Sequence, residues 1–235
     1  MFDPNQPPKN ETKTNPELVQ CFSDKLEKEK SLAFLDTLIE KFPQLEIYLV
    51  GGMVRDTIIN KKSKDYDFVV RGVPMPKLIE ELKKLGKVVL VGRNFGVLTF
   101  TPHGSTLKEA IDIALPRTDQ SAGTGGFRDV QTHSDHNMPV EEDLARRDLT
   151  INAIAWDIKK KQIIDPYNGQ QDLENKIIRA VGEPSERFQE DYSRMLRAIR
   201  FACRFNYVIE QKTGQALQEK MANINDQREM KLTDI

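Results

Sequence analysis

The segment Tyr48–Val70, YLVGGMVRDTIINKKSKDYDFVV, constrains the fold of this chain more than any other. Its first three residues form an apolar run that stops at Gly51 and Gly52, and residues 53–60 can form a short helix. Glycines let the backbone approach a ligand closely, and the free N–H groups at the start of a helix favour a phosphate group. We therefore expect a strand, a phosphate-binding glycine turn and a helix.

Two carboxylates follow this turn. Asp65 and Asp67 lie in a second expected strand, residues 65–70, and positions i and i+2 of a strand face the same side. Arg55, in the first turn of the expected helix, adds a positive charge. Carboxylate oxygens beside phosphates suit Mg²⁺, so Asp65 and Asp67 are candidate catalytic and metal-binding residues. Taken alone, an Asp-x-Asp pair is most often a solvated turn or strand end, and a Gly-Gly pair is most often a turn.

The flanking sequence predicts an α+β fold, with a small mixed β-sheet and a few helices. Apolar residues recur at helical spacing in residues 17–42 and 77–85, and strand patterns cover residues 87–91, 96–101 and 109–115. The last of these strands carries Asp112, which is either a third carboxylate of the site or a strand-end residue with local hydrogen bonds. Residues 116–140 lose all periodicity, and we expect a loop there.

Residues 141–156, EEDLARRDLTINAIAW, indicate a helix, a turn and a short strand. They contain a polar cluster in an apolar context. One interpretation is a surface ion-pair patch with a capping aspartate. The other is that Arg147 meets phosphate or ribose, while Asp148 and Asn152 hydrogen-bond sugar hydroxyls.

A strong helix is predicted from Pro184 to Phe205, and a further one over residues 210–224. Polar side chains recur along the first helix, namely Asp191, Arg194, Arg197 and Arg200. They form either a solvated basic face or a surface for base recognition. In the second case an aspartate acceptor and an arginine donor would hydrogen-bond the Watson–Crick edge of a nucleotide.

These motifs occur in the order seen in a known family. GGMVRD followed by DYD resembles the signature of polymerase-beta-like nucleotidyltransferases, and more narrowly of the bacterial tRNA nucleotidyltransferase/poly(A) polymerase family, the class II CCA-adding enzymes. RRDLTINA resembles the family motif RRDxTINA, and EDYSRMLRAIRF resembles EDxxRxLRAxRF. DPYNGQQDL is similar to the motif that links the family's head and neck domains.

The resemblance implies a polymerase-beta-like palm followed by an all-helical neck. It implies template-independent addition of CMP and AMP, from CTP and ATP, to the 3′ end of an RNA, with tRNA as the expected substrate and two Mg²⁺ ions on Asp65 and Asp67. Gly52 and Arg55 would cradle the triphosphate. The neck helix supplies the remaining implied contacts: Asp191 and Arg194 read the base, and Arg197 and Arg200 contact the triphosphate or support the pocket.

The expected organisation is a disordered tail at residues 1–16, a catalytic head at 17–165 and a neck at 166–235. The resemblance covers residues 48–213 and does not extend to the family's helical body and tail. We therefore expect either a truncated chain or a partner chain that supplies RNA binding. The net charge of −1 agrees with local rather than extensive RNA contacts.

The motifs leave several alternatives open. VGRNFGVLTF is more similar to the CCA-adding pattern than to the basic GRRF-like stretch of poly(A) polymerases, but CC-adding and A-adding enzymes share the same motifs. A non-catalytic nucleotide- or RNA-binding module is a further alternative. The sequence contains no apolar run of membrane-spanning length and only two cysteines, which favours a reduced, cytoplasmic protein with no membrane contact.

Overall fold

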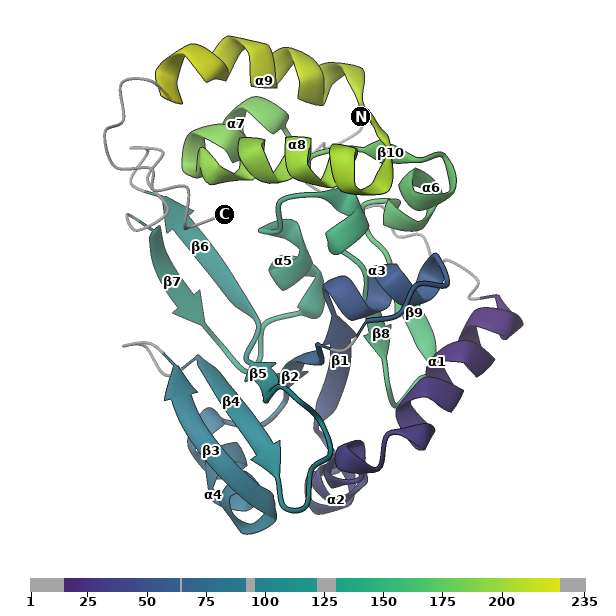
Figure 1. Cartoon of the computed structure of the whole chain (residues 1–235). Helices are drawn as coiled ribbons and strands as arrows, with labels where there is room; N and C mark the ends of the chain where they lie inside the picture. The colour runs from purple at the N-terminus through teal and green to yellow at the C-terminus, as the bar shows by residue number, and fades with distance from the viewer. Residues whose placement is uncertain (1–14, 64, 92–95, 122–129, 225–235) are drawn as a thin grey trace, which may run out of the picture.

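The computed structural model describes residues 15–63, 65–91, 96–121 and 130–224 (Figure 1). The helices are α1 (Pro16–Lys28), the 3-10 turn η1 (Lys30–Leu32), α2 (Phe34–Lys41), α3 (Gly52–Ile58), α4 (Met75–Leu85), α5 (Val140–Ala145), the 3-10 turn η2 (Thr150–Asn152), α6 (Gly169–Glu174), α7 (Pro184–Glu190), α8 (Ser193–Phe205) and α9 (Gln211–Ile224). Within this part of the chain, no helix has the length and apolar character that a membrane crossing requires.

The strands are β1 (Glu46–Val50), β2 (Asp67–Arg71), β3 (Gly86–Val91), β4 (Val97–Pro102), β5 (Ile111–Ala114), β6 (Arg117–Ser121), β7 (Val130–Ser134), β8 (Ala155–Asp157), β9 (Gln162–Ile164), β10 (Ile177–Ile178) and β11 (Val208–Ile209). Seven of them form the main sheet in the order β3-β4-β5-β2-β1-β8-β9. The β2–β5 pair is parallel and the other pairs are antiparallel. The predicted mixed sheet with helices is therefore confirmed.

The alternation of side chains along β1 divides the molecule into two layers. Ile47 and Leu49 join the main core, to which α1, α2 and α4 also contribute. Tyr48 and Val50 point to the opposite face and pack with residues of α5 in a second, smaller cluster. Asp67 lies two residues before Val69 in β2, so both side chains are on the same face of the strand, and Val69 belongs to this second cluster. The sequence pattern thus turns the Asp67 carboxylate away from the main core.

Residues 116–140 do not form the expected structureless loop. β6 and β7 pair as an antiparallel hairpin, from Arg117 opposite Ser134 to Ser121 opposite Val130. The pairing was missed because this hairpin lacks the apolar alternation of a half-buried strand and instead carries polar side chains. Residues 122–129, the tip of the expected loop, lie outside the described residues, as do most of the expected N-terminal tail and residues 225–235.

The single helix predicted from Pro184 to Phe205 is also wrong. α7 ends at Glu190, and Asp191 adopts extended backbone angles of φ −158° and ψ 106°. The Oδ1 atom of Asp191 accepts a hydrogen bond from the backbone N–H of Ser193 at 2.8 Å. Aspartate competes with helical backbone bonds in this way and therefore favours helix starts over helix interiors.

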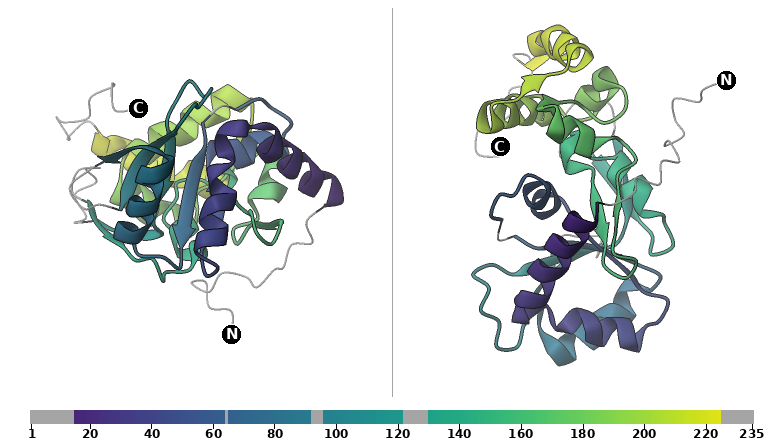
Figure 2. Two further views of the ribbon diagram at one scale, coloured as in Figure 1. Left: turned by 90° about the horizontal axis from the view of Figure 1, so that it is seen from below. Right: turned by 90° about the vertical axis from the view of Figure 1, so that its right-hand side faces the viewer.

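The helices α7, α8 and α9 lie together at the end of the molecule opposite α2 and α4 (Figure 2). This region is not entirely helical, because β10 and β11 form a short parallel pair beside α8. The expectation of an all-helical neck is therefore not confirmed. The division into head and neck at residue 165 stays a prediction.

Candidate functional site

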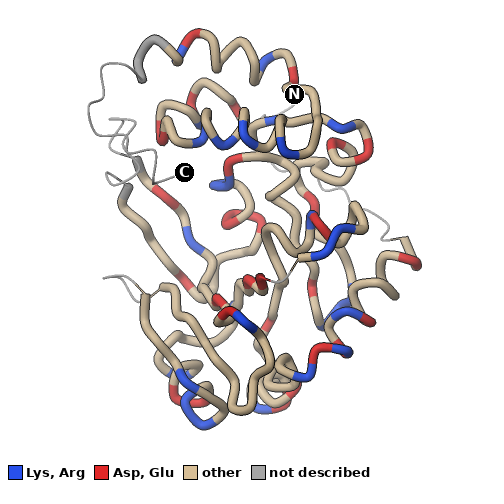
Figure 3. The backbone as a smooth tube through the Cα atoms, in the orientation of Figure 1, with Lys and Arg blue, Asp and Glu red and all other residues tan. Residues whose placement is uncertain are grey.

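A cavity of about 530 Å³ lies where the glycine turn after β1, the start of β2, the β6–β7 hairpin and the helices α7 and α8 meet. Its lining residues are Gly51, Gly52, Arg55, Asp65, Asp67, Asp119, Arg146, Arg147, Asp148, Asn152, Asp191, Arg194, Arg197, Arg200 and Phe201. Every candidate predicted from the sequence except Asp112 is in this set. Figure 3 shows basic positions along the side of α8 that faces the sheet, with acidic positions across from them.

Gly51 brings the backbone into the gap between a carboxylate and a guanidinium. Its φ of +73° lies in the region that L residues rarely adopt. A Cβ atom at this position would stand 3.1 Å from Oδ2 of Asp67 and 3.6 Å from Nη1 of Arg147. A side chain here would therefore occupy the space beside both charged groups.

Asp65 and Asp67 both line the cavity, but β2 starts only at Asp67, so Asp65 precedes the strand. Asp112 lies directly opposite Asp67 in the parallel β2–β5 pair. Burial raises the pKa of Asp67 to about 6, with a further increase from Asp112 and Asp65 that Arg147 opposes. Burial also raises the pKa of Asp112. Asp65 and Asp112 thus crowd Asp67 and disfavour its charged form, although Asp112 is not among the residues that line the cavity.

This crowding suits a cation, although the three carboxylates are not converged on one point. Within the described residues, no group of three or more His, Cys, Asp and Glu side chains is arranged to hold a metal ion. The oxygen-only donor set of Asp65 and Asp67 nevertheless fits Mg²⁺, which prefers one or two carboxylates together with substrate phosphates. The gap that a Cβ of Gly51 would fill leaves room beside Asp67 for such a ligand.

A chain of buried polar contacts connects α3 with α8. Arg55 donates from Nε to Oδ1 of Asp56 at 2.8 Å and from Nη1 to Oδ1 of Asn152 at 2.7 Å. Asn152 donates from Nδ2 to Oδ1 of Asp148 at 3.1 Å, and Arg197 donates from Nε to the other oxygen of Asp148 at 2.7 Å. We refer to these five residues as the α3–α8 chain. Its side chains contact one another, and their predicted contacts with a nucleotide stay predictions.

Two further observations explain why the α3–α8 chain tolerates burial. Burial by itself would raise the pKa of Asp148, but Arg197 and the hydrogen bond from Asn152 hold that pKa below its usual value. The Arg55 guanidinium lies over the rings of Phe201 and Phe205, with centroids 5.1 and 4.9 Å away. Cation–π contacts of this kind partly compensate a desolvated guanidinium.

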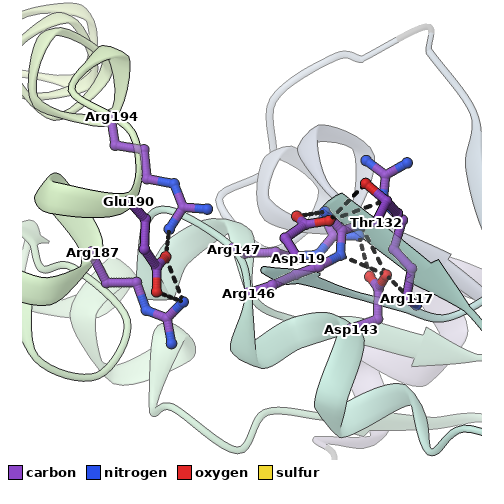
Figure 4. A network of polar contacts seen from close by, with 9 residues as sticks. All are labelled: Arg117, Asp119, Thr132, Asp143, Arg146, Arg147, Arg187, Glu190 and Arg194. Atoms are coloured by element: carbon purple, nitrogen blue, oxygen red, sulfur yellow. Dashed lines mark hydrogen bonds and ion pairs between the residues drawn. The ribbon is translucent and has the colours of Figure 1, made fainter. Parts of the chain in front are cut away.

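Arg146 and Arg147 meet at one buried carboxylate, Asp143 of α5 (Figure 4). Arg146 also donates from Nη1 to Oδ2 of Asp119 on β6 at 3.1 Å. Asp119 and Asp143 were not singled out as site residues from the sequence. The spacing of Asp143 three and four residues before the two arginines is the signal from which its two ion pairs could have been predicted.

Arg194 is held by Glu190, not by Asp191. Its Nη1 lies 2.8 Å from Oε2 of Glu190, which also accepts from Nη1 of Arg187 at 3.0 Å (Figure 4). Because Asp191 lies outside α8, helical spacing does not place it on one face with Arg194. Both residues still line the same cavity, together with Arg200.

Comparison with known proteins agrees with this arrangement. A CCA-adding enzyme of Lactobacillus helveticus is 38% identical over 193 residues, which cover 81% of this chain and 44% of the relative. A solved CCA-adding enzyme in complex with ATP is 29% identical, with a TM-score of 0.66 over 87% of this chain and 46% of its own. A Thermotoga maritima CCA-adding enzyme complexed with tRNA(CCA) is 28% identical, with a TM-score of 0.61 over 85% and 45%.

The chain therefore spans less than half the length of these similar proteins. The family model described as the poly A polymerase head domain matches residues 47–179. These residues carry the glycine turn, the carboxylates and the tandem arginines, and they make up more than half of the sequence. The chain belongs to the family of the poly A polymerase head domain.

Proposed function

We propose that the cavity binds CTP and ATP, and that the chain carries the active site of a template-independent RNA nucleotidyltransferase that adds CMP and AMP to the 3′ end of tRNA. The observation that carries this proposal is that one cavity gathers a glycine turn, two carboxylates, tandem arginines and the Asp191–Arg194 pair. The similarity to CCA-adding enzymes, one of them solved with ATP, supports the choice of substrates.

In the proposed reaction, the RNA 3′-hydroxyl gives up its proton to solvent and its oxygen attacks the α-phosphorus of the nucleotide. The bond from the α-phosphorus to the bridging oxygen breaks, and pyrophosphate leaves with that electron pair. No covalent intermediate with the protein is needed, because positioning and stabilisation of charge suffice. Mg²⁺ on Asp65 and Asp67, as two ions in our proposal, would activate the 3′-oxygen and neutralise triphosphate charge.

The triphosphate and the base of the nucleotide would contact two different sides of the cavity. At the sheet side, the backbone of Gly51 and Gly52 and the guanidinium of Arg147 surround the space that suits a triphosphate. At the helix side, Asp191 and Arg194 offer an acceptor and a donor for the edge of the base. Asp112, beside Asp67, would complete the acidic edge.

The α3–α8 chain would set the distance between these two sides. It runs from Arg55, behind the glycine turn, to Arg197 on the base-reading helix. We therefore propose that Asp148 and Asn152, besides any contact with ribose hydroxyls, keep α8 in register with the sheet. Arg200, over the ring of Phe201 at 5.3 Å, would add positive charge at the triphosphate.

The test is incubation of the chain with Mg²⁺, labelled CTP or ATP, and tRNA that ends in –N, –NC or –NCC. Stepwise addition of C, C and A is the expected result, and Asp67→Ala should abolish it. A long A tail would instead identify a poly(A) polymerase, and addition confined to C or to A would identify a partial enzyme. Nucleotide binding without incorporation would reduce the chain to a binding module that needs a partner, contrary to our proposal.

A further inference from the structure

One residue outside the cavity lining holds both tandem arginines. Asp143 in α5 is 0% exposed, so no ligand reaches it directly. Its Oδ1 accepts from Nε and Nη2 of Arg146 at 3.0 and 2.8 Å and from the backbone N–H of Arg117 at 3.3 Å. Its Oδ2 accepts from Nη2 of Arg147 at 3.1 Å. The two carboxylate oxygens thus have separate partners.

The contacts of Asp143 reach two parts of the site. Through Arg147 they reach the glycine turn, because Nη1 of this arginine also donates to the backbone oxygen of Asn152 at 3.3 Å and lies next to Gly51. Through Arg146 they reach the hairpin, because Nη1 of Arg146 donates to Asp119 of β6. Figure 4 shows Arg146 and Arg147 converging on Asp143, with Asp119 beside Arg146.

We propose that Asp143 is the positioning residue that fixes Arg146 and Arg147 as one rigid pair facing the nucleotide's triphosphate, and that it ties the β6–β7 hairpin to that pair. Two adjacent guanidiniums repel each other, and each arginine side chain has several rotatable bonds. A single buried carboxylate between them offsets the repulsion and selects one arrangement. Such pre-organisation lowers the entropy that is lost when an anion binds.

The consequence for ligand binding rests on the function proposed above. Asp143 contacts neither Asp191 nor Arg194 through any hydrogen bond or ion pair found among the described residues. Loss of its charge should therefore weaken the binding of CTP and ATP by the same factor and leave the ratio of the two affinities unchanged. Arginine contacts to phosphate are charge-assisted, so we expect a loss of about tenfold or more.

Asp143→Asn is the test variant, because it keeps the shape and turns one oxygen into a donor that faces Arg147 or Arg146. Asp157→Asn is the matched control. Asp157 is also buried, at 1% exposure, and pairs with Lys160 at 3.6 Å, but it lies on β8 outside the cavity lining. Thermal unfolding of both variants measures the loss of stability, and calorimetric titration with Mg²⁺ and CTP or ATP measures affinity.

A mutant cycle that removes both arginines separates positioning from a merely structural role. If Asp143 acts through Arg146 and Arg147, then Arg146→Ala/Arg147→Ala and the triple variant Asp143→Asn/Arg146→Ala/Arg147→Ala should bind CTP with similar affinity. A further, multiplicative loss in the triple variant would overturn the proposal, and so would an Asp143→Asn variant that binds CTP as the Asp157→Asn control does. A change in the ratio of CTP to ATP affinity would also contradict it.

A ligand-free measurement keeps this inference distinct from the proposed function. In ¹⁵N relaxation spectra of the arginine side chains, the Arg146 and Arg147 signals should be ordered in the unaltered chain and in Asp157→Asn, and mobile in Asp143→Asn. Unchanged order in Asp143→Asn overturns the positioning role. If the order is lost but the unaltered chain binds no nucleotide, the positioning role stands and the proposed function fails.

Discussion

Replacing Asp67 by asparagine should stabilise the metal-free chain at neutral pH. The pKa of Asp67 is raised from 3.8 to about 6, by burial first and then by Asp112 and Asp65. A carboxylate whose pKa is higher in the folded state favours folding only while it is protonated. That contribution is complete below pH 3.8 and is lost as the pH rises through about 6.

The size of the effect follows from the two pKa values. The difference between 3.8 and about 6 corresponds to about 3 kcal/mol at pH 7.5, because a tenfold change in proton binding is worth about 1.4 kcal/mol. Asparagine carries no charge and avoids this cost. For a chain of this size, that free energy corresponds to a rise of about 6–12 °C in Tm. At pH 4 most of the advantage should vanish, because Asp67 is then largely protonated.

Urea unfolding monitored by circular dichroism, with EDTA present and at pH values from 4 to 8, measures this dependence. Asp148→Asn is the control of opposite sign: the pKa of Asp148 is held low, so its stabilisation is present above its usual pKa and lost as the pH falls. Asp148→Asn should therefore destabilise the chain at pH 7.5. A lower stability of Asp67→Asn at pH 7.5, or an effect of this substitution that does not change with pH, would rule out a raised pKa at Asp67.

Three further predictions concern the same cavity. Mg²⁺ should raise the Tm of the unaltered chain and have little effect on the Tm of Asp67→Asn, because a ligand stabilises only the folded state that binds it. Equal increases in Tm for both proteins in a thermal scan would count against Asp67 as a metal ligand. Gly51→Ala should lower the free energy of unfolding by about 1–3 kcal/mol and weaken CTP binding. Gly104 is the control, because its φ is also positive, at +69°, but nothing lies within 4 Å of an added Cβ. Gly104→Ala should therefore lower stability and leave CTP affinity, measured by calorimetry, unchanged. Arg194→Ala should change the ratio of CTP to ATP incorporation more than the overall rate. Arg187→Ala, which removes another ion-pair partner of Glu190 outside the cavity lining, should leave that ratio unchanged; equal ratios in both variants would exclude a base-reading role for Arg194.

The fold could be predicted where apolar periodicity is strong. The glycine turn, the Asp65–Asp67 segment and the strands around them follow from alternating apolar residues and from the backbone freedom of glycine. The β6–β7 hairpin could not be predicted in this way, because polar contacts such as Thr132 to Asp119 and Arg146 to Asp119 take the place of an apolar face.

The composition of the site was more predictable than its internal contacts. The sequence motifs predicted twelve candidate residues that line one cavity. They did not indicate that hydrogen bonds connect Arg55, Asn152, Asp148 and Arg197 in series. Such pairings depend on which elements face each other across the fold, and local spacing carries no information on that. The break at Asp191 was missed because the apolar spacing continues across it, while the capping preference of aspartate decides the local backbone.

A crystal structure of the chain with Mg²⁺ and a CTP analogue that carries a methylene bridge between the α- and β-phosphorus atoms would show where the nucleotide binds. We predict metal density against Asp65 and Asp67, the triphosphate between Gly51 and Arg147, and the cytosine edge within hydrogen-bond distance of Asp191 and Arg194. A nucleotide bound elsewhere, for example in the cavity of about 490 Å³ beside Lys28 and His103, would contradict the account. So would a cytosine that points away from α8.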